Sequence, residues 1–150
     1  MTTEVLFYHL ERQPLERVLP MLVEKTVERG WRAVIEIGDP ARVQPINALL
    51  WTYKPESFLP HGTKDDGPAA EQPVYLTTAA DNPNGATVRF LVEGAAPADF
   101  SGYDRIVLLF DGRNPDALDA ARGHWKRAKT SDCKLTYWQQ NDDGRWQQKA

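Results

Sequence analysis

The segment RIVLLF, residues 105–110, is the most apolar stretch of the chain and decides the fold class. Arg105 is followed by an unbroken apolar run, without the alternation of polar and apolar residues that marks a half-exposed strand. Such a run is typical of a strand buried on both faces, as in a parallel sheet covered by helices. A helical pattern at 115–129 and a strand pattern at 134–140 follow it. This strand–helix–strand succession predicts parallel pairing.

Strand-like and helix-like segments also alternate upstream of this unit. Apolar residues at helical spacing predict helices over 14–29 and 39–53, the second of them starting with Asp39 as N-cap. Pro20 lies inside the first pattern and predicts either a kink or a later start of that helix. We also predict strands at 5–10, 32–37, 74–78 and 87–93, an exposed loop at 56–72, and a final hairpin that turns at 141–144.

Length and element order together predict one domain over residues 1–150. A chain of 150 residues with 41% hydrophobic residues is long enough for one core. Alternating strands and helices favour a three-layer α/β fold, in which helices cover both faces of a largely parallel sheet.

Composition excludes several classes of protein. Eighteen Lys and Arg residues against 21 Asp and Glu residues give a net charge of −3, which argues against direct, sequence-independent DNA binding. No segment approaches the roughly 20 apolar residues of a membrane span, and the N-terminal residues do not resemble a signal peptide. Cys133 is the single cysteine and allows no internal disulfide. We expect a cytoplasmic protein with no membrane contact.

The sequence lacks the glycine-rich loop with which many α/β sheets hold a nucleotide. Residues 11–14, after the first predicted strand, read ERQP, and side chains at every position would keep the backbone amides away from a pyrophosphate. The three histidines, His9, His61 and His124, have no spacing typical of a metal site. We therefore predict no cofactor, no metal and no catalytic residues.

Two alternatives to a simple binding module stay open at this point. His61 with Asp65 or Asp66 could serve a small α/β nucleotide-processing enzyme or hydrolase. The other alternative is a chaperone-like module specific to one complex. Retention of a nucleotide or metal on purification would favour the enzyme, and capture of several different partners would favour the chaperone.

The first candidate binding feature combines Trp51 with Phe58. Trp51 stands at the end of helix 39–53, and Phe58 follows it after a proline turn. Both could simply close the core. However, the inward positions of that helix are already filled by Val43, Ile46, Leu49 and Leu50, so Trp51 is expected at the margin of the core.

The second candidate feature is one side of helix 115–129. Helical spacing places Leu118, Arg122, Trp125 and Lys129 in one stripe, with Lys126 beside it. The segment from Arg113 to Lys129 contains five basic and two acidic residues, a local charge of +3. The pattern is compatible with an ordinary solvated surface. Its functional interpretation is a site for an anionic peptide that carries an aromatic residue, with Trp125 in apolar contact and the cations holding carboxylates.

Several motifs together resemble the chi subunit family of bacterial DNA polymerase III. They are FYHL at 7–10, ALLWTYKPESFLPHG at 48–62, EQPVYLTT at 71–78, NPNGA at 82–86 and LTYWQQNDDGRW at 135–146. The resemblance implies a non-catalytic replication factor with a Rossmann-like sheet that lacks a nucleotide site. It also implies binding to the acidic, Phe-ending C-terminal tail of single-stranded-DNA-binding protein. The psi subunit would link the protein to the clamp loader where psi is present, and its contact with DNA would be indirect.

The resemblance also assigns residues to the tail-binding site. The helix-end tryptophan and the phenylalanine after it match Trp51 and Phe58, and the contacts of the last helix match Arg122, Trp125 and Lys126. A lysine of the family, one turn before Arg122, corresponds to Leu118 here. Part of the cationic set is therefore missing, and Lys129 and Arg113 are the candidates to replace it.

Overall fold

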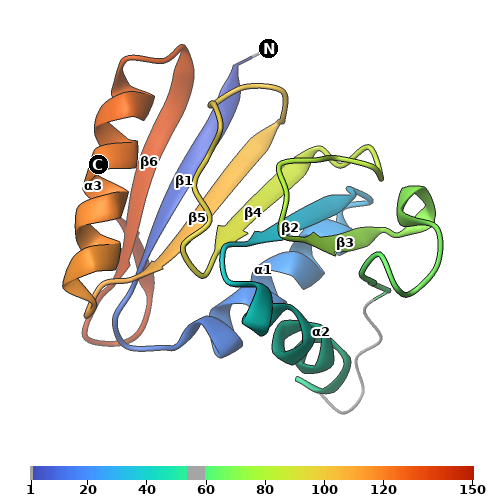
Figure 1. The fold of residues 1–150 in the computed structure, drawn as a ribbon. Coiled ribbons are helices and arrows are strands. Elements are labelled where there is room, and N and C mark those ends of the chain that lie inside the picture. Colours follow the sequence, from blue (N-terminus) through green and yellow to red (C-terminus); the bar gives the residue numbers. More distant parts are fainter. Residues whose placement is uncertain (1, 54–59) are drawn as a thin grey trace.

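The structure, a computed structural model, describes residues 2–53 and 60–150. In these ranges it contains seven β-strands and three α-helices (Figure 1), which confirms the α/β class. Short 3₁₀ turns lie at Pro40–Arg42 and Ala69–Glu71. In chain order the elements are β1 (Thr3–Leu10), α1 (Leu15–Glu28), β2 (Ala33–Ile37), α2 (Val43–Thr52), β3 (Val74–Thr77), β4 (Val88–Val92), β5 (Arg105–Asp111), α3 (Pro115–Lys129), β6 (Cys133–Gln140) and β7 (Trp146–Gln148).

The strands form a single sheet in the order β3-β2-β4-β5-β1-β6-β7. Neighbouring strands are parallel except for β6 and β7, which form the predicted antiparallel hairpin. The apolar strand β5 lies between β4 and β1, with Ile106 opposite Val5. Successive side chains of a strand point to opposite faces, so a strand at the centre of a sheet covered on both faces carries apolar residues at every position.

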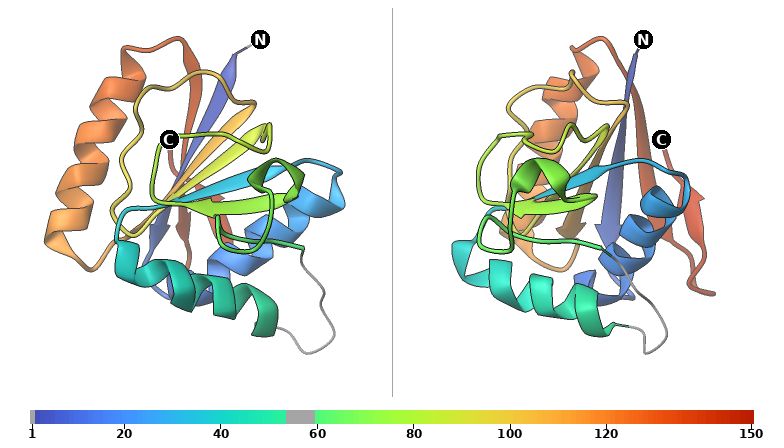
Figure 2. Two further views of the ribbon diagram at one scale, coloured as in Figure 1. Left: turned by 45° about the vertical axis from the view of Figure 1, so that its right-hand side comes forward. Right: turned by 90° about the vertical axis from the view of Figure 1, so that its right-hand side faces the viewer.

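Helices pack on both faces of this sheet (Figure 2). On the first face, Val107 and Leu109 of β5 belong to the same buried cluster as the apolar residues of α1 and α2. On the second face, Ile106, Leu108 and Phe110 of β5 belong to the cluster that contains the buried residues of α3. The helix α3 therefore lies across the sheet from α1 and α2.

Pro20 does not mark the start of the first helix. The helix α1 begins at Leu15 and continues through Pro20, which is buried. The prediction of a later helix start is therefore wrong.

The prediction of an exposed loop over 56–72 is also wrong for part of that segment. His61, Gly62 and Thr63 are buried. The Gly62 backbone N–H donates to the Val74 carbonyl, and the Leu76 N–H donates to the Gly62 carbonyl, both at 3.0 Å. This segment thus runs beside β3 and extends the sheet by a short bridge. The part of the prediction at 56–59 lies outside the described residues.

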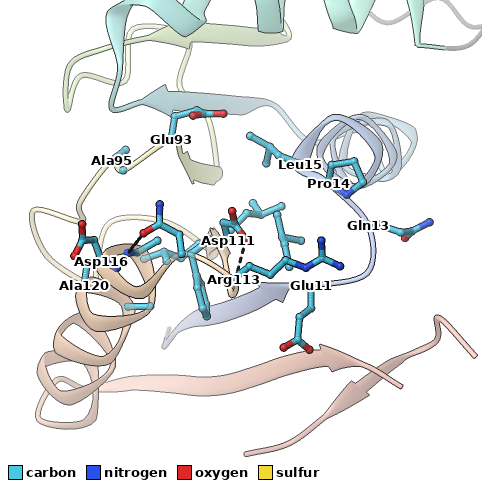
Figure 3. A pocket seen from close by; sticks show the side chains of 18 of the residues that line it. Glu11, Gln13, Pro14, Leu15, Glu93, Ala95, Asp111, Arg113, Asp116 and Ala120 are labelled. Atoms are coloured by element: carbon cyan, nitrogen blue, oxygen red, sulfur yellow. Dashed lines mark hydrogen bonds between the residues drawn. The ribbon is translucent and has the colours of Figure 1, made fainter. Parts of the chain in front are cut away.

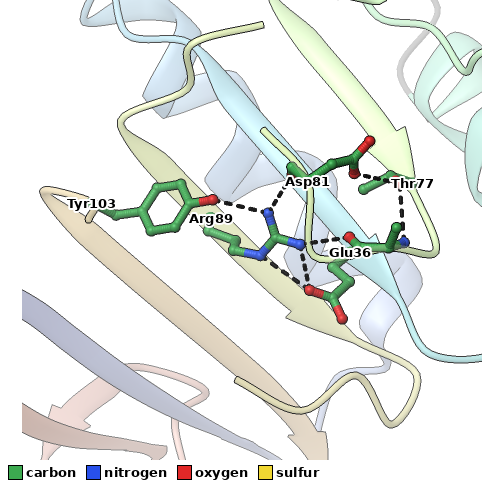
Figure 4. A network of polar contacts seen from close by, with 6 residues as sticks. Glu36, Thr77, Asp81, Arg89 and Tyr103 are labelled. Atoms are coloured by element: carbon green, nitrogen blue, oxygen red, sulfur yellow. Dashed lines mark hydrogen bonds and ion pairs between the residues drawn. The ribbon is translucent and has the colours of Figure 1, made fainter. Parts of the chain in front are cut away.

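A buried ion pair ties two connections to the second face of the sheet (Figure 4). Arg89 of β4 pairs with Glu36 of β2, and only 6% and 13% of their side chains are exposed. Arg89 also donates to the carbonyls of Ala79 and Asp81, at 2.7 and 2.8 Å, and to the Tyr103 hydroxyl at 3.0 Å. A buried charge is tolerated when partners surround it in this way, so the pair holds the β3–β4 and β4–β5 connections in place.

Candidate functional site

The helix α3 has the predicted bounds and is well terminated at its start. Asn114 caps it by accepting hydrogen bonds from the backbone N–H of Asp116 and Ala117, at 2.9 and 3.2 Å. Ala121 and Ala128 are buried against the second face of the sheet. Their small side chains bring the helix axis close to the strands.

Trp125 is held between two other aromatic rings. Its ring centroid lies 5.3 Å from that of Phe7 and 5.5 Å from that of Tyr137, with interplanar angles of 78° and 82°. Edge-to-face pairs of this kind are favourable and restrict ring rotation. Phe7, Trp125 and Tyr137 together form what we call the aromatic platform, and Trp125 is half-buried in it.

The hydroxyl of Tyr137 is held by a hydrogen bond with His9, with 2.6 Å between Tyr137 Oη and His9 Nδ1. The imidazole lies against Gly112, where a Cβ atom would be 1.9 Å from His9 Nε2, so a side chain at this glycine would displace the ring. Burial raises the pKa of Tyr137 above its ordinary value, while the nearby Arg122 lowers it and Glu11 raises it. The phenol is therefore protonated at neutral pH. Sequence reasoning missed Tyr137, whose partner His9 is 128 residues away in the chain.

The predicted cations lie on the solvent side of the platform. Arg122 has 68% of its side chain exposed and forms a loose ion pair with Asp119, with 3.6 Å between Nη1 and Oδ1. Lys126 and Lys129 are also exposed. Exposed pairs of this kind contribute little to stability, so Arg122 is available to a competing anion. We call this side of α3 the cationic flank (Arg122, Trp125, Lys126 and Lys129).

Arg127 has a different role from its basic neighbours. Its guanidinium lies over the ring of Phe100, at 5.4 Å from the centroid, and donates to the Pro97 carbonyl at 3.2 Å. These contacts fasten the β4–β5 connection to α3. Arg127 is therefore structural and does not belong to the cationic flank.

Trp51 is exposed, as its place at the margin of the core predicts. It lies in the last turn of α2 with 48% of its surface accessible, and its ring is 4.3 Å from that of His61. His61 is itself buried and fixed by a hydrogen bond between Nε2 and the Asn47 carbonyl at 3.0 Å. Phe58, the expected companion of Trp51, lies outside the described residues.

The structure does not bring Trp51 and Trp125 together. Trp51 ends α2, which packs on the first face of the sheet, whereas Trp125 belongs to α3 on the second face (Figure 2). The expectation that both tryptophans border one slot is wrong, because the sheet lies between their helices. Arg122, Trp125, Lys126 and Lys129 do share one side of α3, as predicted.

Comparison with known proteins decides the family. The family model of the DNA polymerase III chi subunit, HolC, matches residues 1–136. A probable DNA polymerase III subunit chi from Rickettsia prowazekii (strain Madrid E) is 33% identical over 114 residues, covering 69% of this chain and 67% of that protein. The chain belongs to the chi subunit family. As a chi protein, it is an accessory subunit of DNA polymerase III.

Leu118 stands where the resemblance predicts a lysine, and the structure shows what this apolar side chain does. The side chain is partly buried and packs against the second-face core beside Trp125. It therefore supports the aromatic platform but brings no charge. Of its two candidate replacements, Lys129 lies on the cationic flank, whereas Arg113 precedes α3 and lines a hollow on the other side of the helix.

The alternative site built on His61 has a structural explanation in this chi protein. The Asp66 carboxylate accepts hydrogen bonds from the Thr63 backbone N–H at 2.8 Å and from its hydroxyl at 2.9 Å. These bonds lower the pKa of Asp66. His61 and Asp66 thus organise the segment beside β3, and no observation favours a catalytic role for them.

In the described part of the chain, no helix is long and apolar enough to cross a membrane.

Proposed function

We propose that this chi protein is a non-catalytic subunit of the replication machinery that captures the acidic, Phe-ending C-terminal tail of single-stranded-DNA-binding protein. The observation that carries the proposal is the half-buried Trp125, fixed by Phe7 and Tyr137 at the centre of an exposed cationic flank. A closely packed aromatic surface beside exposed cations suits a peptide that combines an aromatic ring with carboxylates.

The chemistry of the flank suggests how such a tail is held. The terminal phenylalanine packs on the aromatic platform, and its carboxylate replaces Asp119 as the partner of Arg122. Upstream acidic residues of the tail face Lys126 and Lys129. Because these cations are exposed, each contributes weakly and is screened by salt, so we expect modest, salt-sensitive binding.

The position of Trp51 on the other face of the sheet from Trp125 supports a separate contact for it. An exposed tryptophan at a helix end is a common anchor in protein interfaces. We propose that Trp51 and Phe58 bind another component of the assembly, namely psi where it is present or the clamp loader. The protein then links two partners across the sheet, and its contact with DNA is indirect.

The same proposal includes a Rossmann-like, three-layer arrangement without a phosphate-binding loop. Residues 11–14 contain no glycine, and the turn between β5 and α3 uses its own amides internally. The Arg113 N–H donates to Asp111, and the N–H groups of Asp116 and Ala117 donate to Asn114. No cofactor or metal is required for peptide capture, and the protein would act in the cytoplasm.

Peptide titration tests the tail-binding proposal. A fluorescent acidic peptide ending in phenylalanine should bind saturably to the wild-type protein, and the same peptide without its terminal phenylalanine should bind far more weakly. The Arg122→Glu/Lys126→Glu variant should lose binding, whereas Lys25→Glu, which reverses another exposed cation on α1, should retain it apart from a small long-range effect. Equal binding of the two peptides, or normal binding by the double variant, would contradict the proposal.

Trp51→Ala distinguishes the two proposed contacts. The variant should bind the tail peptide normally and recover less clamp-loader protein in a pull-down from lysate. Loss of tail binding in this variant would place both contacts at one site.

A further inference from the structure

A hollow of about 670 Å³ lies beside α3 (Figure 3). Helical spacing puts its lining residues Ala117 and Ala120 on a different side of the helix from the cationic flank. It is bordered by the β1–α1 connection, the turn after β4, the end of β5 and the first half of α3. Its volume is within the range of small-ligand sites. Apolar residues on its wall include Leu10, Leu108 and Phe110.

Small residues create this hollow. Ala117 and Ala120 of α3 face Gly94 and Ala95, which follow β4. Farther along the helix, Ala121 and Ala128 are buried against the sheet. At the start of the helix the same small side chains leave open space. We call this side of α3 the alanine flank (Ala117, Ala120 and Ala121).

The hollow lies at a point where the chain topology favours a ligand site. The strand β1 connects through α1 to β2, past β5 and β4, whereas β5 connects through α3 to β6, past β1. The crossover connections that leave the adjacent parallel strands β1 and β5 thus run toward opposite edges of the sheet. Ligands of open α/β sheets bind beyond the carboxyl ends of the strands at such a switch point.

The lining disfavours an anion, although a helix starts at this edge. The backbone N–H groups of Arg113, Asp116 and Ala117 already donate to side-chain oxygens of Asp111 and Asn114. The amides that would hold a phosphate at a helix N-terminus are therefore occupied.

Carboxylates outnumber cations around the hollow. Arg42, from the turn before α2, holds two of the carboxylates, bonding to Glu16 at 2.9 Å and to Glu93 at 3.3 Å. Glu93 adopts a left-handed backbone with φ of 53°, which is sterically unfavourable for a residue with a side chain. The ion pair between Arg42 and Glu93 therefore lies at a strained turn on the rim of the hollow. The ionised lining residues are Glu11, Glu16, Glu93, Asp111 and Asp116 against Arg12 and Arg113.

The remaining charges leave the hollow negative. Arg12 pairs with Asp142 of the β6–β7 turn. Arg113 is then the only lining arginine without an ion pair in the described ranges, and Asp111 and Asp116 line the hollow with it. The Glu11 carboxylate is directed toward β6, where it accepts a hydrogen bond from Gln139 at 3.3 Å and lies 3.6 Å from His9 Nε2. His124 does not change the balance, because burial and the charge of Arg127 lower its pKa and keep it neutral.

We propose that this hollow binds an alkylammonium group, with the aliphatic stem on the alanine flank and the cationic head among the carboxylates. A lysine side chain of a neighbouring protein and a free polyamine share this chemistry. The proposal is independent of tail capture, because the two sites use opposite sides of α3.

Two probes test the site and separate the two sources. Cadaverine represents a free polyamine, and a glycine-lysine-glycine tripeptide blocked at both ends represents a protein side chain. A tripeptide with norleucine in place of lysine keeps the stem and removes the charge. Binding is followed by NMR shifts of the amides of Ala117 and Ala120. We expect saturable binding of the lysine tripeptide or of cadaverine, and no binding of the norleucine tripeptide. The probe that binds more tightly identifies the source of the alkylammonium group.

Two variant pairs locate the binding. Asp116→Asn should weaken it about fivefold, as expected for a lost charge-assisted contact, whereas Asp119→Asn on the same helix should leave it unchanged. Ala120→Leu should abolish binding by filling the hollow, and Ala48→Leu on the exposed side of α2 should not. Absence of saturation with both probes, or normal binding by Ala120→Leu, would overturn the proposal.

Discussion

The two sides of α3 differ in what lies beneath them. On the cationic flank, Trp125 fills the space above the sheet by packing against Phe7 and Tyr137. On the alanine flank, Ala117 and Ala120 leave that space open. One helix thus presents a filled, positively charged surface on one side and a negatively charged hollow on the other. The comparison shows that side-chain volume, and not charge alone, decides whether a helix side is a platform or a cavity.

Removal of Trp125 should produce the largest effect. Trp125→Ala deletes a half-buried ring from the platform, so we expect the free energy of unfolding to fall by about 2–3 kcal/mol, below the cost of a fully buried tryptophan. Urea denaturation measures this change. Trp51→Ala is the matched control, because its exposed ring should cost much less. Equal losses in the two variants would mean that Trp125 is not held as described.

Charge reversal should affect binding while leaving stability nearly unchanged. Arg122→Glu/Lys126→Glu should weaken the affinity for the tail peptide more than about tenfold, equivalent to about 1.4 kcal/mol of binding free energy. Both side chains are exposed, so the unfolding free energy should change by less than about 0.5 kcal/mol. Fluorescence anisotropy and urea denaturation measure the two quantities. Cadaverine binding should not weaken in this variant, and a large loss would show that the two flanks do not act separately.

The Tyr137 hydroxyl tests whether the platform depends on the residue beneath it. Tyr137→Phe keeps the ring but leaves the buried His9 Nδ1 without its partner, so we expect a loss of about 1–2 kcal/mol in unfolding free energy. Adding His9→Phe to this variant removes the unpaired nitrogen and should recover part of the loss. A double-mutant cycle measures this coupling. Additive effects would show that the hydrogen bond contributes nothing.

Much of the fold could be predicted because its signals are local. The apolar run 105–110 predicts a strand buried on both faces, and the helical pattern at 115–129 predicts α3 with the bounds that the structure shows. The burial of residues 61–63 could not be predicted, because it depends on pairing between Gly62 and the edge strand β3. Glycine and charged neighbours predict a loop, but the backbone hydrogen bonds that bury this segment are made with residues later in the chain.

The candidate site also has features that local sequence patterns predict and features that depend on contacts between distant segments. Helical periodicity places Arg122 and Trp125 on one side of α3, and the structure agrees. The placement of Trp51 depends on which face each crossover helix covers, and no local pattern shows that. Tyr137 and His9 meet only because β6 pairs with β1. The hollow could not be predicted from the sequence either. An alanine of a helix is compatible with close packing, as at Ala121, and with open space, as at Ala117.

The smallest expected effect is the pH dependence that His124, a residue lining the hollow, gives to stability. Burial and the charge of Arg127 lower the pKa of His124 from 6.5, so below that pH the unfolded chain binds a proton more readily than the native state. Stability should therefore fall as pH drops through the unfolded value, until the lowered native-state pKa is passed. His124→Gln removes this titration, and its unfolding free energy should change less between about pH 7.5 and about pH 5. An NMR titration of the imidazole gives the pKa directly. A midpoint at or above the ordinary value would contradict the prediction, because a neutral His124 is what keeps that side of the hollow free of positive charge.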